Sequence, residues 1–64
     1  MRVNGKDFEV KEGTTVEELL EIVSVDKNKV VVELDGEIIS KDDFAKIAIK
    51  NSNIIEVISF VGGG

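Results

Sequence analysis

The chain has 64 residues, of which 42% are hydrophobic, and its 13 acidic and 8 basic residues give a net charge of −5. This length allows one domain, whose core must be densely packed because no cysteine is present to form disulfides. The absence of cysteine and histidine removes the commonest metal ligands and the commonest general base, so we predict no metal site. The negative charge argues against nucleic-acid partners and, more weakly, against anionic membranes. With no visible signal peptide and no membrane-length apolar run, we interpret the protein as cytoplasmic.

The first expected element is a β-hairpin. Asn4-Gly5 is the strongest short signal for a type I′ turn, because both central residues of that turn need a positive φ. Strands are therefore predicted over residues 1–4 and 6–10, and side chains should alternate between the two faces of the sheet.

The segment KEGTTVEELLEIV, residues 11–23, predicts an amphipathic helix. Its apolar stripe recurs at helical spacing and comprises Val16, Leu19, Leu20 and Val23. Thr15 with Glu18 predicts a capping box at the start of the helix, and Thr14 with Glu17 offers the same motif one residue earlier. We expect the apolar stripe to pack on one face of a sheet.

Three more strands are expected in the second half of the chain. Residues 30–34 and 37–39 flank Asp35-Gly36, which is a second signal for a tight turn. Residues 54–61, IIEVISFV, are apolar nearly throughout, which is typical of a central strand covered on at least one side.

A short helical turn and a loop are expected between these strands. Ser40, with Asp43 three residues later, gives a weak N-cap signal for a turn through KDDFAKI. Phe44 in this segment is the natural anchor to the core, and KNSN, residues 50–53, is a loop. The element order predicts an α+β domain over residues 1–61, in which a four- or five-stranded mixed sheet grasps one main helix and the terminal strands lie side by side.

The sequence does not predict an enzyme. None of its serines or threonines has a plausible base nearby in the sequence, and the many carboxylates are best explained as a solvated surface. The segment from Asp26 begins like a calcium loop, but Val31 stands where that motif requires glycine.

The last three residues raise the functional question. Glycine loses more conformational freedom on ordering than any other residue, so we expect residues 62–64 to form a flexible tail. The chemical group of such a tail is the α-carboxylate of Gly64. A carboxylate can attack the α-phosphate of ATP to give an acyl-adenylate, which a sulfur or nitrogen nucleophile then displaces. This chemistry would occur inside a partner's active site, which a slim glycine tail can enter.

The whole chain resembles the ThiS family, the β-grasp, ubiquitin-like sulfur carriers of thiamine biosynthesis. The stretches that carry this resemblance are VNGKDFEV, EGTTVEELLE, VVVELDGEIISKDDF and IIEVISFVGGG. Phe44 stands where that family often has tryptophan, and KNSN replaces its more usual Asp-Gly-Asp type of turn. Neither departure affects the tail.

The resemblance implies a role and partners. An E1-like enzyme of the ThiF type would use ATP to adenylate Gly64, and the carrier itself would bind no cofactor. A persulfide enzyme would supply sulfur to make a thiocarboxylate, and a thiazole synthase of the ThiG type would receive it. Val61, Gly62 and Gly63 would enter the partner's active site.

The last strand also predicts a docking surface. Ile54, Ile58 and Phe60 share one face with Glu56, whereas Ile55 and Val57 share the other. Because one helix covers only one face of a sheet, we expect Ile54, Ile58 and Phe60 to form an exposed apolar patch beside the tail.

Two other functions stay open at this point. A molybdopterin-synthase type of sulfur carrier, or a ubiquitin-like protein modifier, would have the same fold and tail. A β-grasp binding module with inert glycines would have the fold without the chemistry.

Overall fold

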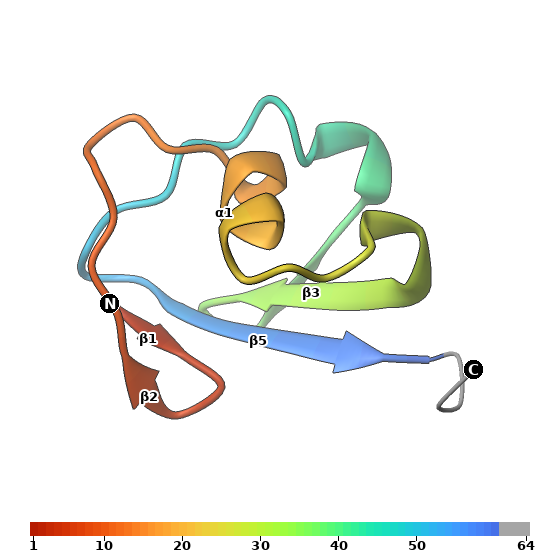
Figure 1. The fold of residues 1–64 in the computed structure, drawn as a ribbon, viewed down its shortest axis with the longest axis horizontal. Helices are drawn as coiled ribbons and strands as arrows, with labels where there is room; N and C mark the ends of the chain where they lie inside the picture. The colour runs from red at the N-terminus through yellow and green to blue at the C-terminus, as the bar shows by residue number, and fades with distance from the viewer. Residues whose placement is uncertain (61–64) are drawn as a thin grey trace.

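The computed structural model describes residues 1–60, which form a five-stranded sheet with one α-helix on one side (Figure 1). In chain order the elements are β1 (Arg2–Val3), β2 (Lys6–Asp7), α1 (Val16–Ile22), the 3₁₀ turn η1 (Lys27–Lys29), β3 (Val30–Leu34), β4 (Glu37–Ile39), the 3₁₀ turn η2 (Lys41–Asp43) and β5 (Ile54–Ser59). The strand order is β2-β1-β5-β3-β4, and only the β1–β5 pair is parallel. The predicted mixed sheet grasping one main helix is therefore confirmed. In this part of the chain no helix has the length and apolarity needed to cross a membrane.

Both predicted tight turns are present. Asn4 and Gly5 have φ values of 52° and 81°, and Asp35 and Gly36 have values of 50° and 86°. Positive φ at both central residues is the mark of the type I′ turn, whose twist matches that of the flanking strands. The β1–β2 and β3–β4 hairpins therefore form as their local sequences predict.

The second strand is shorter than predicted, because β2 ends at Asp7 rather than near residue 10. The backbone N–H of Phe8 still donates to the carbonyl of Met1 (2.9 Å). The backbone N–H of Val10 instead donates to Oδ1 of Asn51 (3.3 Å). The chain thus leaves the sheet after Phe8 and is held by the loop before β5.

The two terminal strands lie side by side, as predicted. Arg2 and Val3 pair in parallel with Ile54 and Ile55. The side chain of Asn4 extends this contact beyond the strand: its Oδ1 accepts from the Val57 N–H (2.8 Å) and its Nδ2 donates to the Val57 carbonyl (3.3 Å). The same residue that makes the hairpin turn therefore also fastens β1 to β5.

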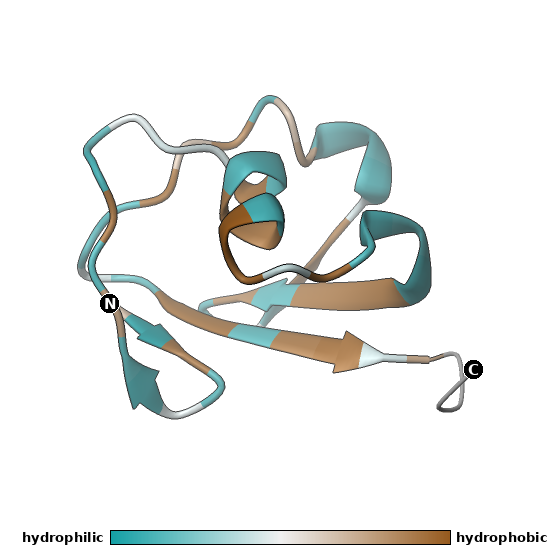
Figure 2. Ribbon diagram, viewed as in Figure 1, coloured by the Kyte–Doolittle hydropathy of each residue, from teal (hydrophilic) through white to brown (hydrophobic). Residues whose placement is uncertain are grey.

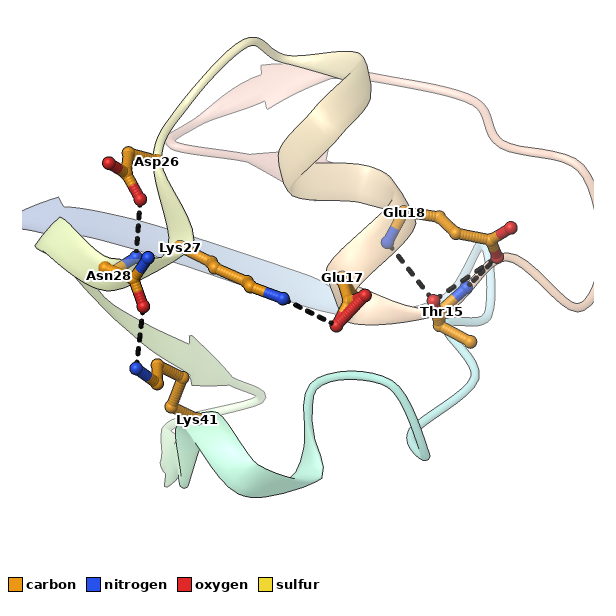
Figure 3. A network of polar contacts seen from close by, with 7 residues as sticks. All are labelled: Thr15, Glu17, Glu18, Asp26, Lys27, Asn28 and Lys41. Carbon is orange, nitrogen blue, oxygen red and sulfur yellow. Dashed lines mark hydrogen bonds and ion pairs between the residues drawn. The ribbon is translucent and has the colours of Figure 1, made fainter.

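The helix begins with the Thr15–Glu18 capping box (Figure 3). The Glu18 N–H donates to Oγ1 of Thr15 (3.1 Å), and the Thr15 N–H donates to Oε1 of Glu18 (2.9 Å). These bonds satisfy donors that the first helical turn leaves free. The alternative register from Thr14 is wrong, because the Thr14 hydroxyl donates to the Lys11 carbonyl (2.6 Å) and is buried.

The core lies between α1 and the sheet. Its buried apolar members are Val3, Val16, Leu19, Leu20, Val30, Val32, Phe44, Ile49 and Ile55. Phe44 is 1% exposed, which confirms it as the anchor of the segment after β4. Its carbonyl also accepts the Glu17 N–H (3.0 Å), so this segment covers the start of the helix.

Polar contacts hold the two 3₁₀ turns near the helix (Figure 3). Asp26, the start of the rejected calcium-loop match, caps η1 by accepting the Asn28 N–H (2.8 Å). Lys27 pairs with Glu17 of α1 (3.2 Å), and Lys41 of η2 donates to Oδ1 of Asn28 (2.7 Å). The turn η1 was not expected from the sequence. The turn η2 was expected, and Ser40 caps it by accepting the Asp42 N–H at 3.3 Å.

We predict that Phe44→Ala lowers the free energy of unfolding by about 3–5 kcal/mol, because it removes a fully buried ring. Phe60→Ala is the matched control, since the same ring is removed from a side chain that is 61% exposed, and it should cost less than about 1 kcal/mol. Urea unfolding followed by circular dichroism measures both. Equal losses would contradict the burial of Phe44.

We also predict that Thr15→Ala lowers the free energy of unfolding by about 1 kcal/mol, because the capping hydroxyl is lost. Thr15→Ser keeps a hydroxyl at the same position and should lose much less. The comparison uses the same urea titration, and a serine variant as unstable as the alanine variant would argue against the capping role.

Candidate functional site

The face of the sheet opposite α1 is the candidate site. The predicted docking residues lie there: Ile54, Ile58 and Phe60 are 57%, 47% and 61% exposed. Ile55, one position along from Ile54, is buried on the helix side. The alternation predicted for the last strand is thus confirmed, and β5 presents large apolar side chains outward.

The strands beside β5 enlarge this surface. Val31 of β3 stands opposite Ile58, and Glu33 stands between Glu56 on β5 and Ile38 on β4. Directly paired residues point to the same side of a sheet, so Ile38, which is 71% exposed, belongs to the same surface. We call Val31, Glu33, Ile38, Ile54, Glu56, Ile58 and Phe60 the open face.

Sequence reasoning missed Ile38 as a member of this surface. Alternation within β4 predicts only that Ile38 and Ile39 point to opposite sides, and it does not say which side carries the helix. The register with Glu33 decides it. The grouping of Val31 with Glu33 could be predicted, because both lie within one strand.

No segment within residues 1–60 covers the open face, and α1 lies on the other side of the sheet (Figure 1). Figure 2 shows β3 and β5 as largely hydrophobic strands, each interrupted by a hydrophilic stretch. A contiguous exposed apolar surface rimmed or broken by polar groups is characteristic of a protein-interaction site.

The open face lies next to the predicted tail. Phe60 is the last described residue, and its N–H donates to the carbonyl of Lys29 (3.1 Å), so the pairing of β5 with the β3 side continues to that point. The predicted domain end at Val61 and the tail residues Gly62, Gly63 and Gly64 lie outside the described residues. Next to the predicted tail, the structure therefore describes the end of β5, which is hydrogen-bonded to the β3 side.

The described residues provide no cluster suited to metal binding: nowhere among residues 1–60 do three or more carboxylates gather as a cation would require. The ion pairs described among residues 1–60 join surface side chains. In the β1–β2 hairpin, for example, Nε of Arg2 lies 3.6 Å from Oδ1 of Asp7. The chemistry that this arrangement supports is recognition of another protein.

Comparison with known proteins identifies the family. The model of the ThiS family matches residues 1–64. The sulfur carrier protein ThiS of Bacillus subtilis is 35% identical over 65 residues, covering 100% of this chain and 98% of that protein. The crystal structure of the thiamine biosynthesis protein ThiS from Geobacter metallireducens superposes with a TM-score of 0.83, at 36% identity, over 98% of this chain and 96% of that one.

A second kind of relative is much longer. A thiazole synthase of Paramagnetospirillum magneticum is 37% identical over 62 residues, which are 97% of this chain but 19% of that protein. This chain therefore spans about a fifth of the length of such a synthase and nearly all of the Bacillus subtilis carrier. These matches confirm the β-grasp fold and the resemblance stated from the sequence, and the chain belongs to the ThiS family.

Proposed function

We propose that this protein is the sulfur carrier for thiazole formation in thiamine biosynthesis and that the carboxyl group of Gly64 carries the sulfur. The observation that supports this most strongly is the family match, which runs over residues 1–64 and so includes the three glycines. A relative of almost the same length bears the name sulfur carrier protein. The relatives described above are carriers of thiamine biosynthesis and a thiazole synthase, which favours this role over a molybdopterin-type carrier or a protein modifier.

The proposed chemistry takes place at the terminal carboxyl carbon. A carboxylate oxygen of Gly64 attacks the α-phosphate of ATP, pyrophosphate leaves, and an acyl-adenylate forms. A persulfide sulfur then attacks the acyl carbon and AMP leaves. A thiol attacks the persulfide enzyme's own sulfur in the resulting acyl disulfide, so a new disulfide forms between that thiol and the enzyme and the thiocarboxylate stays on the carrier. Each step needs catalytic groups that belong to partner enzymes, so the carrier contributes a substrate group and a binding surface.

We further propose three partners. A thiazole synthase receives the sulfur, because thiazole synthases of two bacteria contain a segment similar to this chain. An E1-like enzyme of the ThiF type adenylates the tail, and a persulfide enzyme supplies the sulfur, as the carrier chemistry requires. Because adenylation consumes ATP, we place the reaction in the cytoplasm.

The open face is the proposed docking surface for these partners. Ile58 and Phe60 lie at the end of β5 that leads to the tail, so a partner that binds them also receives Val61, Gly62 and Gly63. Binding energy at this surface would hold the terminal carboxyl group near the reacting groups of the partner.

We predict that deletion of Gly64 abolishes thiocarboxylate formation without changing the unfolding curve, because the deletion moves the terminal carboxyl group one residue back along the tail. The measurement is intact mass after incubation with the activating enzyme, ATP and a sulfur source. The chain that ends at Gly64 should exchange one oxygen for sulfur. Sulfur on the shortened chain would overturn the assignment of Gly64, whereas attachment to a lysine of another protein would indicate a modifier.

We predict that Phe60→Ala weakens binding to the thiazole synthase by about 2 kcal/mol, the size of an interface hot spot. Ile22→Ala is the matched control, since Ile22 is an exposed apolar residue of α1, away from the open face. Isothermal titration calorimetry with the folded variants compares the two. A large loss of stability together with unchanged affinity would show that Phe60 serves the fold rather than the interface.

A further inference from the structure

We infer that Glu33 and Glu56 form an acidic centre in the open face that receives an arginine side chain of the thiazole synthase. This inference rests on the proposed function, since it names the chemistry of one proposed partner's contact surface. It assigns a binding role to the two glutamates of the open face, in addition to that of the apolar side chains.

The two glutamates stand directly opposite each other on β3 and β5. Side chains of directly paired residues start about 4.5–5.5 Å apart, and like charges in such a pair are destabilising. The contacts within residues 1–60 give neither carboxylate a hydrogen bond or an ion pair. The fold therefore holds two negative groups together without neutralising them.

Apolar side chains flank this pair along β5 and on the β4 side, whereas on the β1 side Arg2, which pairs with Asp7, stands beside Ile54. Ile38 stands beside Glu33 on the β4 side, and Ile54 and Ile58 lie two positions before and after Glu56 on the same face of β5. Glu33 is already half-buried, whereas Glu56 is exposed. A protein that covers the isoleucines must also remove water from both carboxylates.

Removing water from unpaired charges is costly, so the covering surface must supply a positive group. A second copy of this chain is a poor occupant, because a two-fold contact centred on the open face would bring glutamates against glutamates. The charge of the centre thus favours a different protein with a complementary cation at the middle of its interface.

An arginine fits this centre better than a lysine. A guanidinium is planar, presents five N–H donors in a fixed arrangement and is weakly hydrated, so it can bond to both carboxylates while it lies against aliphatic side chains. A lysine ammonium is compact and strongly hydrated, so it would lose more hydration free energy when it is buried beside these aliphatic side chains.

The occupant is the thiazole synthase. Synthases of Paramagnetospirillum magneticum and Magnetococcus marinus carry a segment similar to this chain within the same polypeptide, at 37% and 31% identity. A carrier-like segment in the same polypeptide is available to the synthase at high effective concentration. We therefore assign the complementary arginine to that enzyme rather than to the activating enzyme.

The test compares Glu33→Gln/Glu56→Gln with Glu12→Gln/Glu21→Gln, which removes the same charge from exposed glutamates outside the open face. We expect the first variant to bind the thiazole synthase at least about tenfold more weakly, because charge-assisted hydrogen bonds are lost. The control should bind as the unmodified chain does. Calorimetry with the whole synthase measures the affinities, and urea unfolding should show that the first variant is at least as stable as the unmodified chain.

Weaker binding combined with unchanged or increased stability is the signature of a charge centre kept for binding. Unchanged affinity for the synthase, or an equal loss of affinity in the control, would overturn the inference. Because binding is measured with the unmodified chain, before any sulfur is attached, the intact-mass experiment on Gly64 remains independent. A chain that accepts no sulfur but shows the expected binding losses would disprove the carrier role and leave the acidic centre standing.

Discussion

The structure depends on the position of β5 between β1, from the start of the chain, and β3, from its middle. On one side β5 pairs antiparallel with β3 over five residue pairs, and on the other it pairs in parallel with β1. A parallel pair requires a crossover, and the segment that contains α1 supplies it. This arrangement fixes the positions of the helix, the core and the C-terminal end of β5.

One helix can cover only one face of this sheet, so the open face is left exposed. Within residues 1–60 no further segment lies over the second face. The consequence is that large apolar residues such as Ile38, Ile54 and Phe60 remain exposed. In the proposed carrier role this exposure is useful, because a bound partner enzyme would bury the side chains that the small domain leaves exposed.

In the proposed function the partner enzymes supply the catalytic groups, which explains why the described residues include so few reactive side chains. The chain has no cysteine or histidine, and the carboxylates of residues 1–60 form no metal-binding group. A reactive side chain near an activated acyl group would compete for it, so a chemically quiet body suits this role. In this proposal the fold anchors the start of the tail through β5 and offers the open face for recognition by the partner enzyme.

The sequence by itself determined the parts of the protein that rest on neighbouring residues: the turn at Asn4-Gly5, the cap at Thr15 and the alternation that exposes Ile58. Each depends on φ preferences, a hydrogen bond three residues away or the two-residue period of a strand. Only the tertiary structure decided that Glu33 faces Glu56, because strand register joins segments far apart in the chain. Local propensity contains no information about that pairing, so the acidic centre emerged only once the strands were placed side by side.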